Sequence, residues 1–138
     1  MVLLRVVFDT NVYISAALHG HEAETVLELA SAHRIILLTS PAILSELEEK
    51  VRNKLGWSQE RVTLFLKIIR DIVEIVEPQI TLQVVEADED DNRILECAVT
   101  GNASLIVTFD KDLLRLKSYE TTGIITPRQL QFYGLEGR

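Results

Sequence analysis

The side chains best suited to chemistry in this sequence are carboxylates that occur in four separated segments. They are Asp9, Glu46, the group Asp88, Asp90 and Asp91, and the pair Asp110 and Asp112. Two carboxylates held about 4 Å apart repel each other by up to ~4 kcal/mol at an effective dielectric constant of 20. If the fold brings these segments together, the carboxylates cannot all stay ionised unless a positive charge compensates them.

A divalent metal ion is the simplest source of that positive charge. Ligand sets made only of oxygen select hard ions such as Mg²⁺ and Mn²⁺, which also bind water and substrate phosphates. Such an ion can lower the pKa of a bound water and neutralise charge on a phosphodiester. The carboxylates therefore predict metal-dependent hydrolysis of an RNA substrate, in which Asn11 and Thr108 would orient the carboxylates or donate to a phosphate.

Each acidic segment also has an ordinary structural interpretation when it is taken alone. Asp9 can cap a helix that follows a strand, and Glu46 can pair on the surface with Lys50, one helical turn later. Residues 86–91 can form a solvated acidic loop, and Asp110 can cap another helix. The metal-site interpretation requires the four segments to meet, so it depends on the fold.

Strands and helices that alternate along the chain could bring the acidic segments together. Continuous apolar runs rich in β-branched residues predict strands at 2–8, 35–39, 72–76, 105–107 and 123–125. Apolar residues at helical spacing predict helices at 12–18, 22–32, 41–55, 62–73, 92–100 and 127–133. This alternation indicates a three-layer α/β/α fold with a central parallel sheet. Ligands bind at the carboxyl ends of such strands, where Asp9 and Asp110 are expected.

Length, composition and charge restrict the remaining possibilities. A chain of 138 residues, of which 47% are hydrophobic, is expected to form one domain over 1–138. The net charge of −7 argues against a basic surface that coats nucleic acid without specificity. A single cysteine, Cys97, excludes an internal disulfide and favours a reducing cytoplasm. The apolar opening is too short for a signal sequence or a membrane span, so a soluble protein without a membrane partner is expected.

Four stretches of the sequence resemble the signature segments of the PIN-domain family, in matching order and spacing. They are VFDTNV at 7–12, SEL at 45–47, DEDDNRILECA at 88–98 and IVTFDKDLL at 106–114. The resemblance implies a three-layer α/β/α fold and Mg²⁺- or Mn²⁺-dependent endoribonuclease activity. It also implies a homodimer that acts as the toxin of a toxin-antitoxin pair, with an antitoxin protein as partner.

The resemblance carries roles over to individual positions of this sequence. The catalytic acids would be Asp9, Glu46, Asp91 and Asp110. The metal would be bound by these four residues together with Asp112, and Asn11 and Thr108 would support the metal ligands. Asp91 is preferred over Asp88 and Asp90 because it directly precedes the helix expected at 92–100. Phe109 stands where such proteins often have a small residue, so it would narrow the site or stack on a base.

Two other functions stay open from the sequence. Asp9 could be a nucleophile that becomes phosphorylated, as in aspartate-based phosphohydrolases. Such enzymes carry a D-x-D motif after the first strand, whereas this chain has Asp9-Thr10-Asn11. Alternatively, the acidic edge could bind a basic partner in a noncatalytic interaction module. Lys50, Arg52 and Lys54 could contact an RNA backbone or simply be solvated.

Overall fold

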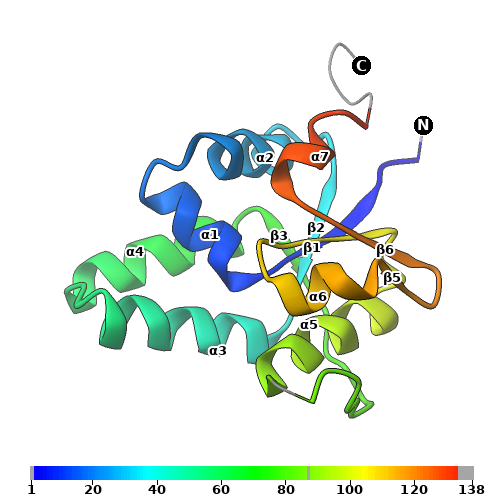
Figure 1. The fold of residues 1–138 in the computed structure, drawn as a ribbon. Helices are drawn as coiled ribbons and strands as arrows, with labels where there is room; N and C mark the ends of the chain where they lie inside the picture. Colours follow the sequence, from blue (N-terminus) through cyan, green and yellow to red (C-terminus); the bar gives the residue numbers. More distant parts are fainter. Residues whose placement is uncertain (1, 87, 134–138) are drawn as a thin grey trace.

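A six-stranded sheet forms the middle layer of the protein in a computed structural model that describes residues 2–86 and 88–133 (Figure 1). The strands are β1 (Arg5–Phe8), β2 (Ile36–Thr39), β3 (Val73–Ile75), β4 (Leu105–Val107), β5 (Ser118–Tyr119) and β6 (Thr122–Ile125). Their order across the sheet is β3-β2-β1-β4-β6-β5. Every pairing is parallel except that of β5 with β6, so the carboxyl ends of β1 and β4 lie at the same edge.

Helices cover both faces of the sheet, which confirms the expected three-layer α/β/α fold. One apolar core contains residues of α1 (Thr10–Ala17), α2 (His21–Ser31), α4 (Gln59–Arg70) and α7 (Pro127–Leu130). The core on the opposite face contains residues of α5 (Glu89–Thr100) and α6 (Lys111–Leu116). α3 (Pro41–Glu49) contributes to both cores, because Leu44 and Leu47 belong to the first and Ile43 to the second.

The continuous apolar runs of the central strands are explained by this double burial. Val6 and Phe8 of β1 belong to the core on one face, and Val7 between them belongs to the core on the other. Leu37 and Leu38 of β2 divide in the same way. Successive side chains of a strand point to opposite faces, so a strand with helices on both sides needs apolar residues at every position.

Several element boundaries differ from those expected from the sequence. α5 begins at Glu89 rather than at 92, because the Asp88 carboxylate accepts a hydrogen bond of 2.9 Å from the Asp90 backbone N–H and caps the helix. The predicted helix 41–55 changes at its end into the π-helical turn η1 (Lys50–Lys54). There the Leu55 backbone N–H bonds to the Lys50 carbonyl, five residues earlier, at 3.1 Å.

The C-terminal part of the chain contains two elements that are not among the predicted helices and strands, the helix α6 and the strand β5. β5 is only two residues long and forms an antiparallel hairpin with β6, beside an otherwise parallel sheet. α7 ends at Leu130, whereas the expected helix continued to 133. Among the described residues, no helix is long and apolar enough to cross a bilayer.

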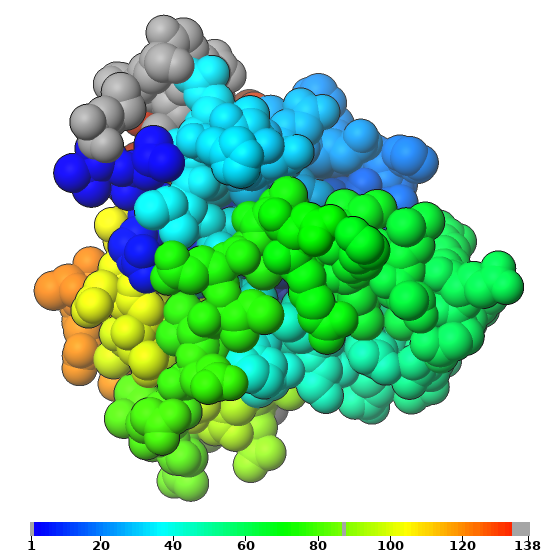
Figure 2. Space-filling model, turned by 180° about the vertical axis from the view of Figure 1, so that it is seen from behind, coloured from blue at the N-terminus to red at the C-terminus, as the bar shows by residue number. Residues whose placement is uncertain are grey.

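The described residues 76–86, which follow β3, form no helix or strand and run over the outside of the molecule (Figure 2, green). The buried Asn92 side chain fastens this segment to α5. Its Oδ1 accepts hydrogen bonds from the backbone N–H groups of Val84 and Val85 at 2.9 and 2.8 Å, and its Nδ2 donates to the Val85 carbonyl at 2.8 Å. One turn later, Glu96 accepts from the Leu82 backbone N–H at 2.8 Å. These bonds hold the chain that leads into Asp88.

Replacing Asn92 by Ala should therefore destabilise the protein. The substitution leaves two backbone N–H groups and one carbonyl without their side-chain partner, and such losses cost about 1–3 kcal/mol per buried group. We expect the free energy of unfolding, measured by urea denaturation, to fall by about 3 kcal/mol. The matched control is Asn53→Ala on the exposed surface of η1, which should change it by less than about 0.5 kcal/mol. A small effect of Asn92→Ala would contradict the role given to this side chain.

Candidate metal centre

Asp9 lies at the carboxyl end of β1, directly beside the end of β4. The register of the two strands places Phe8 opposite Val107, and the Asp9 backbone N–H donates to the Val107 carbonyl at 3.0 Å. The Thr108 hydroxyl donates to Asp9 Oδ2 at 2.8 Å and accepts from the Asp110 backbone N–H at 2.9 Å. Thr108 thus fixes the Asp9 carboxylate and ties it to the start of α6.

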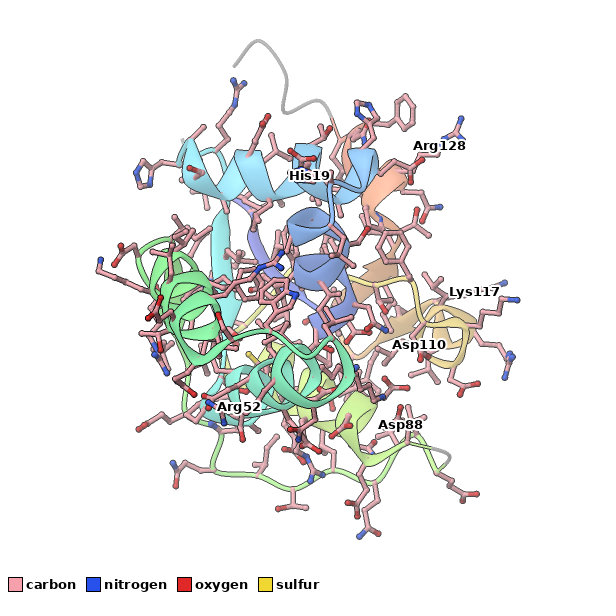
Figure 3. All side chains as sticks on the ribbon, turned by 90° about the vertical axis from the view of Figure 1, so that its left-hand side faces the viewer. His19, Arg52, Asp88, Asp110, Lys117 and Arg128 are labelled. Atoms are coloured by element: carbon pink, nitrogen blue, oxygen red, sulfur yellow. The ribbon has the colours of Figure 1, made fainter. Side chains whose placement is uncertain are left out.

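Three carboxylates meet at this edge of the sheet. Asp88, Asp91 and Asp110 each offer one oxygen, and these oxygens all lie within 4.8 Å of one another. Asp88 and Asp91 come from the start of α5, and Asp110 caps α6 by accepting from the backbone N–H groups of Asp112 and Leu113 at 2.8 and 3.1 Å. In Figure 3 the labelled Asp88 and Asp110 lie on the same side of the molecule. Segments far apart in sequence therefore supply one acidic group.

Asp91 is the most perturbed member of this group. Its side chain is almost completely buried, and its Oδ2 is without a hydrogen-bond partner among the described residues. Burial raises the pKa of Asp91 to about 8, with further increases from the charges of Asp110, Asp88 and Asp9. A buried carboxylate with a free oxygen has a strong need for a proton or a cation.

Asp9 also needs compensation for its burial. Burial raises its pKa above the ordinary value of 3.8, and the Asp110 charge adds to this effect. The hydrogen bond from Thr108 and the charge of Lys50 act in the opposite direction. Although Asp9 stands at the N-cap position of α1, its side chain makes no capping hydrogen bond. Its carboxylate is directed instead to the two threonine hydroxyls, with Thr10 Oγ1 at 3.4 Å from Oδ1.

Glu46 occupies a neighbouring part of the same edge and is paired with Lys50. Its Oε1 lies 2.9 Å from Lys50 Nζ and 3.3 Å from Thr10 Oγ1, so Thr10 stands between Asp9 and Glu46. The Glu46 side chain is only 11% exposed, so this is not the solvated surface pair that i, i+4 spacing usually indicates. Burial raises the pKa of Glu46, while Lys50 opposes the increase.

The other residues predicted from the sequence to belong to the site lie around this acidic group. Asn11 is exposed and its Oδ1 lies 3.4 Å from Lys50 Nζ. Asp112 forms an ion pair of 2.9 Å with Arg115 and is outside the group of three. Asp88 belongs to that group together with Asp91, so the two residues are not alternatives. Asp90 is exposed, and Asp91 lies within the first turn of α5 rather than before it.

Two contributors to the site were not identified from the sequence. The Thr10 hydroxyl contacts both Asp9 and Glu46, and Lys50 was considered only as an RNA contact or a surface partner. The i, i+4 spacing of Glu46 and Lys50 was the available signal for the pair. The burial of the Glu46–Lys50 pair could not be predicted from this spacing, because the burial depends on the packing of α1 against α3.

A groove of about 430 Å³ lies elsewhere, between α1, α2 and α4. Its lining is mainly apolar and includes Leu27, Trp57 and Phe65, with Arg61 stacked 3.8 Å above the Trp57 ring. None of the carboxylates described above lines it. The acidic edge of the sheet, rather than this groove, is the part of the described structure that is equipped for chemistry.

Comparison with known proteins decides the family. The family model described as PIN domain matches residues 5–112. The chain belongs to the PIN-domain family. This PIN domain is 35% identical over 120 residues to the uncharacterized protein MJ1680 of Methanocaldococcus jannaschii. The match covers 83% of this chain and 76% of that protein. Its fold also matches a chain in the crystal structure of VapBC2 from Rickettsia felis bound to a DNA fragment from their promoter. That match has a TM-score of 0.63 and 19% identity, and it covers 88% of this chain and 97% of that chain.

The raised pKa of Asp91 predicts how the metal-free PIN domain responds to pH. The unfolded chain releases this proton near the ordinary pKa of 3.8, whereas the folded protein keeps it up to about 8. The stability gained from the proton is therefore fully present below about pH 4 and is lost as the pH rises to about 8. In EDTA, we expect Asp91→Asn to flatten this decline and to exceed the wild type at pH 8 by at least about 2 kcal/mol.

Urea denaturation at several pH values measures this effect, and Glu89→Gln is the matched control. Glu89 is in the same first turn of α5 but is exposed, so its substitution should leave the slope of the wild type in place. Equal slopes for the wild type and Asp91→Asn would show that Asp91 is not the buried acid described here.

Proposed function

We propose that this PIN domain is a Mg²⁺- or Mn²⁺-dependent endoribonuclease that hydrolyses RNA phosphodiesters. The observation that carries the proposal is the meeting of Asp88, Asp91 and Asp110 within 4.8 Å, with one buried Asp91 oxygen left without a partner in the described structure. Surface carboxylates are usually solvated and apart, whereas these are brought together and partly removed from water. Membership of the PIN-domain family supports the same chemistry.

The residues at the sheet edge fit a hard divalent cation. Every candidate ligand is a carboxylate oxygen, which favours Mg²⁺ or Mn²⁺ over zinc. Asp88, Asp91 and Asp110 would hold the ion, and Asp9 adjoins them in the position that Thr108 fixes. When bound, such an ion neutralises charge on a phosphodiester and lowers the pKa of water. Its charge would also offset the repulsion that raises the pKa of Asp91.

The other residues of the edge have roles that follow from their contacts. Asp9 has a raised pKa and a fixed position, which suit a group that accepts a proton from an attacking water. Glu46 is a further acid of the centre and stands on the far side of Thr10 from Asp9. Phe109 is 39% exposed next to Asp110 and offers a ring on which an RNA base could stack.

We further propose that the protein is the toxin of a toxin-antitoxin pair. The support is the family together with the fold match to a chain of the VapBC2 complex. On this proposal the protein acts as a homodimer in the cytoplasm, and an antitoxin protein binds it and restrains cleavage of RNA.

Substituting Asp9 by Asn should remove the activity while preserving the fold. We expect Mn²⁺-dependent cleavage of a fluorophore-labelled single-stranded RNA to fall by about 100-fold or more, since the amide cannot accept the proton. The same variant should be more stable than the wild type in EDTA, because it removes one buried charge from the cluster. Glu89→Gln is the control and should cleave at the wild-type rate.

Retention of full cleavage by Asp9→Asn would remove Asp9 from the chemistry. The same preparations separate the other two functions left open by the sequence. An aspartate-nucleophile phosphohydrolase would turn over p-nitrophenyl phosphate and form a phosphoryl-aspartate, and a noncatalytic module would neither bind Mn²⁺ nor cleave RNA.

The toxin proposal has a cellular consequence. Induced expression of the wild type in a bacterial host without the antitoxin should arrest growth, whereas Asp110→Asn should not. Asn retains the capping oxygen that the start of α6 needs but carries no charge for the metal. Growth curves and immunoblots of equal expression make the comparison, and arrest by both proteins would mean that the centre is not its cause.

A further inference from the structure

The ammonium group of the half-buried Lys50 lies among oxygen atoms of the acidic centre. Its Nζ is 2.9 Å from Glu46 Oε1, 3.0 Å from Thr10 Oγ1 and 3.4 Å from Asn11 Oδ1. Thr10 and Asn11 belong to α1 and Glu46 belongs to α3, so two helices supply the oxygen atoms around the ammonium group. The Lys50 side chain is only 21% exposed.

The neighbouring basic residues of η1 do not share this position. Arg52 pairs with Glu48 at 2.7 Å and is 42% exposed, and Lys54 is exposed at the end of the turn. Figure 3 shows the labelled Arg52 away from Asp88 and Asp110. Lys50 is therefore not one member of a basic surface stripe, and its role has to be sought among the carboxylates.

The acidic edge consists of two halves that differ in how their charge is balanced. Asp88, Asp91 and Asp110 form one half, in which the described side chains provide no ammonium or guanidinium contact. Glu46 forms the other half, and Lys50 balances its charge directly. Asp9 stands between the halves, because it interacts electrostatically with both Asp91 and Lys50.

We propose that Lys50 is a built-in cation that takes the place of a second divalent ion, so that each chain binds a single metal ion at Asp88, Asp91 and Asp110. This inference rests on the proposed function as a metal-dependent nuclease. A second dication at Glu46 would have to displace the ammonium from three oxygen contacts or remain beside it against strong repulsion. Lys50 is thus a positioning residue, which holds Glu46 against Thr10 and supplies a permanent positive charge.

Counting bound Mn²⁺ tests the inference without reference to activity. The full chain is titrated with MnCl₂ by isothermal calorimetry, and free Mn²⁺ is measured independently by electron paramagnetic resonance. We expect one ion per chain for the wild type and two for Lys50→Met, which keeps the length of the side chain but removes its charge. Lys50→Arg keeps a cation and Lys54→Met removes an exposed one from the same turn, so both should bind one ion.

The possible outcomes separate this inference from the function on which it rests. Two ions bound by the wild type, or a single ion bound by a folded Lys50→Met, would overturn the role of Lys50 and leave the nuclease proposal in place. Failure of the wild type to bind Mn²⁺ would overturn both. If Lys50→Met does not fold, as judged by circular dichroism, the wild-type count and Lys50→Arg still decide: one ion for each supports the inference, and two for either overturns it.

Discussion

Repulsion among carboxylates at one edge of the sheet is the constraint on which the arrangement of this PIN domain depends. Parallel pairing of β1 with β4 brings Asp9 beside Thr108, and the starts of α5 and α6 add Asp91 and Asp110. Burial weakens the screening by water, and the pKa of Asp91 rises to about 8 as a result. Hydroxyl groups, backbone N–H groups and one lysine offset part of this repulsion, and the repulsion that is left favours the binding of a cation.

The sheet edge was predictable from sequence because the central strands, which are covered on both faces, are continuous apolar runs. Asp9 and Asp110 follow such runs directly, so their placement required only the parallel topology. Asp91 was preferred over Asp88 and Asp90, but the sequence did not show that Asp88 lies beside it. The start of α5 was expected three residues too late, and each residue turns a helix by about 100°. β5 was not predicted because a strand of two residues is too short to show an alternation of apolar and polar residues.

Several side chains serve the ordinary structural roles that the sequence also allowed. Asp110 caps α6 with one oxygen and still belongs to the acidic group, and Glu46 forms an i, i+4 pair that happens to be buried. Structural and functional interpretations of such residues are therefore compatible with each other. What the sequence could not provide was burial, since the exposure of the Glu46 and Lys50 side chains is set by α1, a helix distant in the chain.

The hydrogen bond between Thr108 and Asp9 joins residues that are 99 positions apart. During synthesis β1 precedes its partner β4 by the whole chain from α1 to α5, and pairing of the two strands closes this long loop at an entropic cost. A growing chain thus carries Asp9 long before it carries Asp110. The acidic group therefore cannot assemble on a nascent chain until β4 and the start of α6 have been made.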